Sequence, residues 1–434
     1  MRSLRFKSDS TVIWLFVLQF ACQLALLFPP FAKIRVVFRM CSFGLSIVLL
    51  TIVGGQRPVS PGHPSRLFVA PILGILILST LLAEDSEILA GFASIMFNFS
   101  ILAPLIWMPK LQIRLAGFKK VVLLYWLFHS VGAGVGLLQV KYPGRFDPTP
   151  AINYIEGSMA AESMKIRLAS GEKVFRPMGL TDQPGGAANS AFAAMSFGIG
   201  LLLTSKGYVA PAFISASIFF SVVCLCMGQV RLLVVLSVIV FVSVLLMLLW
   251  RQRIIASFRV ASLCLIMAIV GFFVAYDLGR DTVTKRLSTL IAEDPRKVYA
   301  MNRGLFLNNV RYNVFAEYPL GAGAGRWGLM NAYFGTKEKL LWAEIMWEGW
   351  MYDGGLPLII CYSTAVMVAL WVAIRISKSR TSSREVSMWG ISLAAYNIGL
   401  IATTFSFPVF SSQAGLEFWL FNSMFYAAAK SDRF

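Results

Sequence analysis

Twelve apolar stretches divide the chain and leave room for few kinds of fold; most are about 17 to 25 residues long, and one, 342–374, is longer than a single membrane crossing and is expected to begin outside it. They lie near 11–28, 36–53, 67–83, 89–107, 119–138, 186–204, 208–227, 230–250, 258–276, 342–374, 387–407 and 414–429. Hydrophobic residues make up 57% of the 434 residues, and only 14% are charged, well below the usual share in soluble domains. The sequence predicts an all-α polytopic membrane protein with about 12 transmembrane helices, and it excludes a soluble enzyme, a secreted disulfide scaffold and a disordered tail.

The basic residues are distributed unevenly between the two sides of the predicted membrane. With the N-terminus inside, the inner segments hold 19 basic and 3 acidic residues, and the outer ones hold 20 basic and 18 acidic residues. The net charge of +18 thus divides into +16 inside and +2 outside, as the positive-inside rule expects. We therefore expect both termini in the cytoplasm and no nucleic acid partner. The six cysteines lie in or beside apolar runs, and there are two histidines, so no disulfide framework and no metal site is expected.

The predicted spans and loops define five segments. Residues 1–138 hold the first five helices, 139–184 form a first outer loop, and 185–276 hold helices six to nine. A large outer loop with an amphipathic helix covers 277–341, and 342–434 hold the last three helices. Because most other connections are short, any chemistry is expected in the two outer loops.

A helix with two arginines is expected in the large loop. Between Asn302 and Tyr318 apolar residues recur at helical spacing, with Arg303 and Arg311 on a neighbouring polar flank. Pro319 ends this helix. Two interpretations stay open: an interfacial helix whose arginines face lipid phosphates, or an arginine clamp on a bound diphosphate.

A glycine-rich turn follows directly. Gly321, Gly323 and Gly325 allow a turn with exposed backbone amides, which suits an anion, and Arg326 comes next. Small residues also serve close helix packing, so the turn is a weak signal by itself.

Two further outer arginines are candidates. Arg176 ends the first loop near the membrane surface, and Arg231 starts a span after a very tight turn. A charge at the membrane boundary is a candidate functional residue, although a loop anchor or a side chain reaching toward water explains it equally well.

Three acids follow the large loop. Glu344 and Glu348 are four residues apart, which places them on one face of an expected helix, and Asp353 lies about opposite to Glu344. They can form salt bridges with the arginines, or one of them can act as a general base toward a hydroxyl.

In combination these motifs resemble the O-antigen ligase and polymerase superfamily of bacterial membrane glycosyltransferases, which have GT-C architecture. Arg176-Pro177-Met178-Gly179 resembles the family's Arg-x-x-Gly, and Arg231 stands at its span-start arginine. Arg303 through Gly323 resembles its arginine, amphipathic helix and Pro-Leu-x-Gly-x-Gly signature. The resemblance by motif covers roughly residues 170–360. It implies a bacterial inner-membrane enzyme with a periplasmic active site that uses an undecaprenyl-diphosphate-linked glycan.

One departure from the family favours a polymerase over a ligase. Where ligases have an essential histidine this chain has Glu344, and several polymerases have an acid there. The resemblance implies metal-independent, inverting transfer without a cofactor, from a lipid-linked oligosaccharide donor to a glycan or lipid A core acceptor. Glu344, or failing it Glu348 or Asp353, would be the base, and the arginines Arg176, Arg231, Arg303 and Arg311 would hold the diphosphate.

Several alternatives stay open. Within the superfamily they are an O-antigen ligase, a protein-directed oligosaccharyltransferase and a peptidoglycan polymerase, which differ in the acceptor. From another class comes a polysaccharide or lipid transporter or flippase, because twelve spans are also common among transporters. Transporters usually hold charges near mid-membrane, however, and only Arg39 lies well inside a predicted span. A scaffold without activity would not need clustered arginines and acids.

Overall fold

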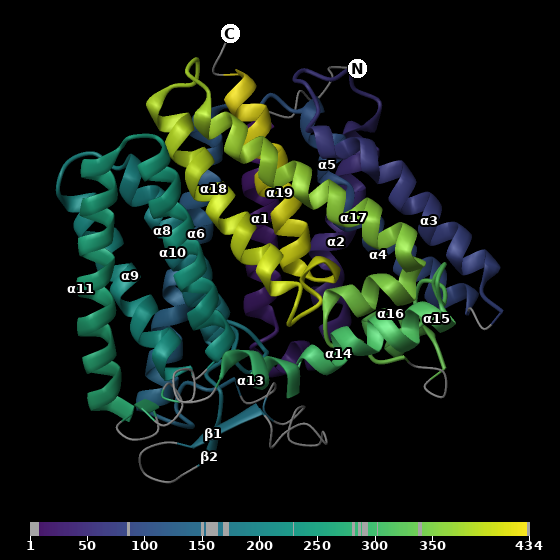
Figure 1. Cartoon of the computed structure of the whole chain (residues 1–434), viewed down its shortest axis with the longest axis horizontal. Helices are drawn as coiled ribbons and strands as arrows, with labels where there is room; N and C mark the ends of the chain where they lie inside the picture. The colour runs from purple at the N-terminus through teal and green to yellow at the C-terminus, as the bar shows by residue number, and fades with distance from the viewer. Residues whose placement is uncertain are drawn as a thin grey trace. The chain divides into compact units, whose positions relative to one another are not determined.

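The structure, a computed structural model, describes residues 8–84, 87–148, 152, 164–167, 173–228, 230–279, 283–284, 288, 294–301, 303–336 and 341–431, most of which are helical (Figure 1). The longer helices are α1 (Ser8–Ala25), α2 (Arg35–Gly54), α3 (Val69–Leu82), α4 (Ile88–Leu102), α6 (Leu115–Lys141), α8 (Gly186–Thr204), α9 (Val209–Met227), α10 (Arg231–Trp250), α11 (Ile254–Gly279), α17 (Met346–Lys378), α18 (Arg384–Thr403) and α19 (Gln413–Ser431). The shorter helical segments are η1 (Pro29–Ile34), η2 (Pro64–Phe68), α5 (Pro104–Trp107), η3 (Met108–Lys110), α13 (Pro295–Met301), α14 (Arg303–Asn309), η5 (Val310–Val314), α15 (Phe315–Glu317), α16 (Gly328–Phe334) and η7 (Val409–Ser411). A small antiparallel pair, β1 (Lys165–Arg167) and β2 (Lys173–Phe175), is the one sheet in the described residues.

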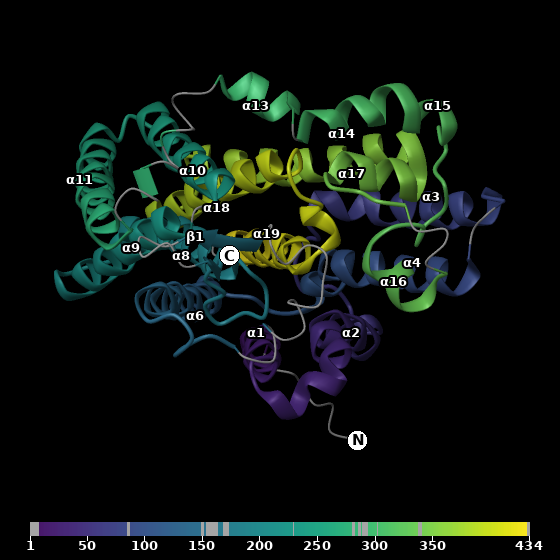
Figure 2. The same cartoon turned by 90° about the horizontal axis from the view of Figure 1, so that it is seen from below.

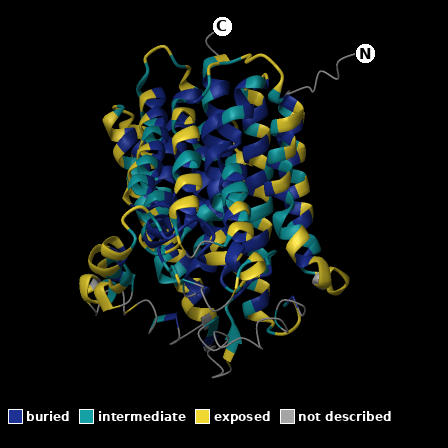
Figure 3. Ribbon diagram, turned by 90° about the vertical axis from the view of Figure 1, so that its right-hand side faces the viewer, coloured by how far each residue is buried: buried dark blue, intermediate teal, exposed yellow. Residues whose placement is uncertain are grey.

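Long apolar helices confirm a multi-pass membrane protein. Helix α10 is rich in valine, which favours strands in water, yet a bilayer requires each segment to satisfy its own backbone hydrogen bonds. Among the described residues nine helices are long and apolar enough to cross, or ten if the bent pair α4 and α5–η3 counts as one span. Large apolar side chains such as Phe258 and Phe273 stay exposed on α11, as expected where lipid is the solvent. Figure 3 marks the exposed residues along the helices in yellow.

All twelve predicted ranges fall on helices, but two helices do not meet the criteria for a span. Helix α1 is apolar over only Asp9–Ala25, and α19 carries polar residues such as Glu417 and Asn422. Most of α19 is buried within the protein, and a helix shielded from lipid can retain polar groups. Twelve crossings, the side of the termini and the five-segment division therefore stay predictions.

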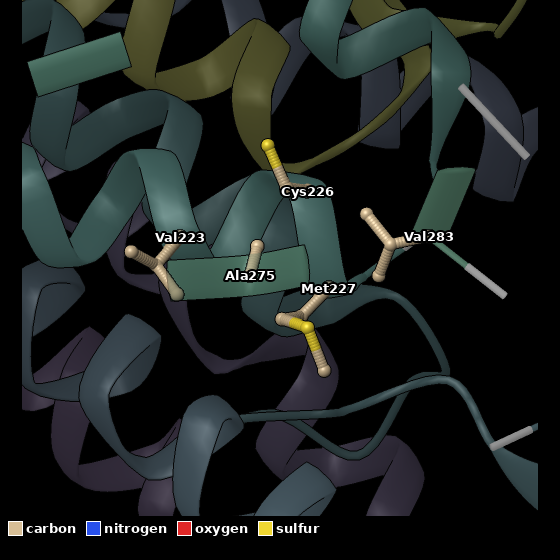
Figure 4. Close-up of a cluster of buried hydrophobic side chains, with 5 residues drawn as sticks. All are labelled: Val223, Cys226, Met227, Ala275 and Val283. Carbon is tan, nitrogen blue, oxygen red and sulfur yellow. The ribbon is translucent and has the colours of Figure 1, made fainter. Parts of the chain in front are cut away.

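The helices form two compact units. The first consists of 1–42, 116–294 and 383–396. In it α8, rich in alanine, glycine and serine, is buried along most of its length and packs closely against α9 and α10. One apolar cluster joins Val223, Cys226 and Met227 of α9 to Ala275 of α11 and to Val283 (Figure 4).

The second unit consists of 43–115, 295–382 and 397–434. Its helix α17 packs against α3, and α19 packs against α4 and α5. Asn397 and Asn422 are fully buried and exchange two side-chain hydrogen bonds of 2.8 and 3.0 Å. Such paired amides join helices where no water is present to bind them.

Candidate functional site

Helix α17 is broken within the second unit, which its sequence only partly explains. Gly354 and Gly355 have non-helical backbone angles, and Pro357 lacks the N–H that would bond to the carbonyl of Asp353. The Ser79 hydroxyl donates to that carbonyl instead. The sequence predicted one continuous helix here. The break instead leaves polar backbone groups without helical partners inside an apolar helix.

The glycine turn after Pro319 fills this break. The Ala322 amide donates to the Tyr352 carbonyl (2.7 Å), and the Leu356 amide donates to the Pro319 carbonyl (3.0 Å). These two bonds replace helical bonds that the break removes. Irregular backbone inside a membrane helix is tolerated only where other parts of the protein satisfy its hydrogen bonds. The glycine turn does this for the break in α17, and we call it the plug.

The turn does not offer its amides to an anion in the way that the sequence suggested. Four amides already donate within the protein: Gly321 to Tyr318, Ala322 to Tyr352, Ala324 to the Thr80 hydroxyl, and Gly325 to the Asp353 carboxylate. The alternative of close packing, which the sequence left open, explains the glycines better. A Cβ at Gly321 would lie 2.7 Å from the Gly354 Cα, closer than real atoms approach.

This packing gives a stability prediction with an internal control. Gly321 and Gly328 both have positive φ, 98° and 72°, but a Cβ at Gly328 would meet no atom within 4 Å. Gly328→Ala is expected to cost about 1 kcal/mol for its backbone alone, whereas Gly321→Ala should cost about 3 kcal/mol or more. Thermal unfolding of the two purified variants measures the difference, and equal losses would contradict the plug.

The arginine helix predicted in the large loop is present. Segments α14, η5 and α15 form one continuous helical run in which η5 is a π-helical turn, and Asn302 lies outside the described residues. Val310 and Val314 are buried, and the run packs against α17 (Figure 2). Its buried valines therefore face protein. Arg303, at the start of the run, lies next to Glu344, which precedes α17.

Arg303 and Glu344 form an ion pair outside the membrane helix. Their side chains are 40% and 24% exposed, so an incoming molecule can reach both. The Trp342 indole, itself 66% exposed, donates to the other Glu344 oxygen (2.9 Å). Partial burial lowers the pKa of Arg303, which the nearby Tyr299 hydroxyl partly offsets, and the guanidinium stays charged at neutral pH.

Glu344 does not lie on a helix, contrary to the sequence prediction. Helix α17 begins at Met346, whose amide donates to the Thr404 carbonyl (3.0 Å), and Ile345 is extended. Glu344 and Glu348 therefore do not share a helix face. They still meet, because the Glu344 amide donates to a Glu348 carboxylate oxygen (3.2 Å).

Glu348 and Asp353 are buried, with 1% and 3% of their surface exposed. The second oxygen of Glu348 accepts from the Asn309 side chain (2.9 Å). The Asp353 carboxylate accepts from the Trp327 indole and the Gly325 amide, so it joins the glycine turn to the broken helix. Of the three acids the sequence singled out, Glu344 alone is both accessible and next to an arginine.

Two other predicted arginines approach each other in the first unit. Arg176 follows β2 and is partly buried, and Arg231 is the first residue of α10. Burial lowers the pKa of Arg176, and the charge of Arg231 lowers it further. A helix start is also an unfavourable place for a cation.

The remaining predicted residues differ in exposure. Arg311 is exposed, with its guanidinium 5.2 Å from the ring of Tyr312, whereas Arg326 is buried within the glycine turn. Among the aromatic residues between Trp327 and Tyr352, Trp342 and Tyr333 are exposed, and Trp327, Trp350 and Tyr352 are buried. Within the described ranges no three His, Cys, Asp or Glu side chains are placed to hold a metal ion.

Two contacts were missed by the sequence reasoning. Arg39, the charge noted inside a span, pairs with Asp182 (2.8 Å), which also binds Arg35 (2.8 Å). Arg35 and Asp182 are buried and Arg39 is half-buried, and their contacts hold the loop that follows Arg176. Asn309 was not singled out either, since an asparagine on an amphipathic helix carries no local signal. Both contacts join residues far apart in sequence.

The sequence matches no protein-family model, and a search of curated proteins finds no significant match. The resemblance to the O-antigen superfamily stays a prediction from the motifs.

Proposed function

We propose that the protein is a membrane glycosyltransferase that transfers a glycan from a lipid diphosphate, such as undecaprenyl diphosphate, to an acceptor sugar hydroxyl on the periplasmic face. The observation that carries this proposal is the accessible contact between Arg303 and Glu344 at the start of α17. A cation for a leaving diphosphate and a carboxylate for a hydroxyl proton are the two groups such a transfer needs.

In the proposed reaction the acceptor oxygen attacks the anomeric carbon, and the bond from that carbon to the diphosphate oxygen breaks. Glu344 takes the hydroxyl proton, and the lipid diphosphate leaves with the bonding electrons. Arg303 is charge-complementary to the leaving group, whose negative charge grows as the bond breaks. Attack opposite the leaving group inverts the anomeric configuration.

Arg176 and Arg231 are a separate candidate for binding a diphosphate, within the first unit, since the charge of Arg231 acts on Arg176 there. A bidentate guanidinium matches phosphate geometry better than an ammonium group does. In this proposal the exposed Trp342 and Tyr333 contact sugar rings.

The test is turnover by the purified protein in nanodiscs. It receives an undecaprenyl-diphosphate-linked repeat unit, EDTA and no nucleotide sugar, and the products are separated by size. The expected result is a ladder of glycans, which marks a metal-independent polymerase. A single addition to lipid A core would indicate the ligase instead, and no turnover together with no donor binding would favour the transporter.

A further inference from the structure

We propose that Glu348 is a positioning residue rather than the general base: its carboxylate bridges Asn309 of the arginine helix and the backbone of Glu344, and so holds Glu344 against Arg303. This inference rests on the proposed function, because it divides the roles of the acids in that reaction.

The bridge consists of two hydrogen bonds to one carboxylate. The Asn309 side-chain amide donates to Glu348 Oε1 (2.9 Å), and the Glu344 backbone amide donates to Oε2 (3.2 Å). Asn309 ends α14, whose first residue is Arg303. Glu348 therefore joins the helix that carries the arginine to the segment that carries the accessible acid.

Burial separates the two acids by role. Glu348 is 1% exposed, and both of its oxygens are occupied by N–H donors, so an acceptor hydroxyl has no route to it. Its place in the first turn of α17 suits a carboxylate, which the helix N-terminus stabilises. The Glu344 side chain is 24% exposed. Glu344 can thus meet a substrate while Glu348 fixes its backbone.

The direction of the bridge is set by a third side chain. Asn313 donates its amide to Asn309 Oδ1 (2.9 Å), which leaves the Asn309 nitrogen to face Glu348. The Tyr352 hydroxyl also hydrogen-bonds Asn309, and a hydroxyl can donate or accept. Position 309 is therefore the donor and position 348 the acceptor, and this order can be reversed.

The test exchanges the two groups. Asn309→Asp alone places two carboxylates against each other, and Glu348→Gln alone places an amide nitrogen against another or loses the bond from Glu344. In the double variant the substituted amide at position 348 donates to the new carboxylate at position 309 and still accepts from the Glu344 amide. Asn313 keeps its acceptor, so every hydrogen bond is restored.

Each single variant of the full-length protein in nanodiscs is expected to lose about 10²-fold in kcat, with the donor KM changed by less than about threefold, because the base is misplaced and not removed. Asn309→Asp/Glu348→Gln should recover kcat to within about fivefold of wild type. Asn308→Asp is the matched control, since Asn308 is exposed on the same helix and gains the same charge. It should retain wild-type kcat.

Melting temperatures of the same set provide a readout that needs no turnover. Both single variants should melt lower than wild type, and the double variant should recover. A double variant that melts like wild type but stays as inactive as Glu348→Gln would show that the carboxylate at position 348 does the chemistry, which overturns the inference. Single variants with wild-type kcat would overturn it too. If wild type transfers glycan from no lipid-linked donor, the proposed function fails and the positioning role with it, while the melting data still decide whether the bridge exists.

Discussion

Glu344→Gln is expected to lower kcat for glycan transfer by about 10³-fold, the typical range for removing a general base. The amide keeps the shape of the side chain and can still accept from the Trp342 indole, but it cannot take a proton from the acceptor. It also removes the negative charge that pairs with Arg303, so donor affinity should hold or rise. Single-turnover transfer from a labelled lipid-linked repeat unit, together with equilibrium binding of that donor, measures both quantities.

Glu317→Gln is the control for this variant. Glu317 is an exposed acid at the end of α15, so its substitution makes the same change of charge away from Arg303. It should leave kcat unchanged. If Glu344→Gln keeps wild-type activity while Asp353→Asn loses it, the base is assigned to the wrong acid even if the reaction is right.

Arg303→Ala is expected to lower kcat/KM for the donor by about 10²- to 10³-fold, because in the proposed reaction it removes the cation that stabilises the leaving diphosphate. Unlike Glu344→Gln, this change should raise the donor KM as well as lower kcat, since in the proposed reaction the guanidinium binds the diphosphate before and during bond cleavage. Inorganic pyrophosphate should inhibit the wild-type protein and inhibit Arg303→Ala much less. Initial rates over a range of donor and pyrophosphate concentrations provide the measurement.

Folding should survive the loss of Arg303. The side chain is 40% exposed, and exposed ion pairs contribute about 0 to 1 kcal/mol. Lys297→Ala is the matched control, because Lys297 is an exposed cation in α13 of the same unit. It should leave kcat/KM for the donor unchanged. Arg303→Lys should recover part of the activity, since it restores the charge without the fork of donors. Equal pyrophosphate inhibition of wild type and Arg303→Ala would remove Arg303 from the site.

The helices were the most predictable part of this protein. Each of the twelve predicted ranges lies on a helix, and the amphipathic helix after Asn302 ends before Pro319 as its spacing and the proline indicate. The start of α17 was not predictable in the same way. An apolar run continues across Glu344 without a break, and the helix begins at Met346 because the distant Thr404 carbonyl accepts the Met346 amide.

In the candidate site, too, the sequence predicted some features, and others depended on contacts between distant residues. The sequence identified Arg303 and Glu344 by residue type and by resemblance, and the structure brings them into contact. The sequence left the glycine turn open between an anion site and close packing, since a pattern of glycines does not reveal which groups its amides bind. The partners of these amides include Tyr352 and Asp353 of the broken helix.

The sequence by itself determined that this chain forms long apolar helices, because a bilayer forces each segment to satisfy its own hydrogen bonds and so makes helix formation a local property. Only the tertiary structure decided what each acid does. Asp353 contacts the glycine turn, Glu348 bridges to Asn309, and Glu344 is left accessible beside Arg303. These contacts join residues from separate elements, and their geometry depends on how the helices pack, which no local pattern encodes.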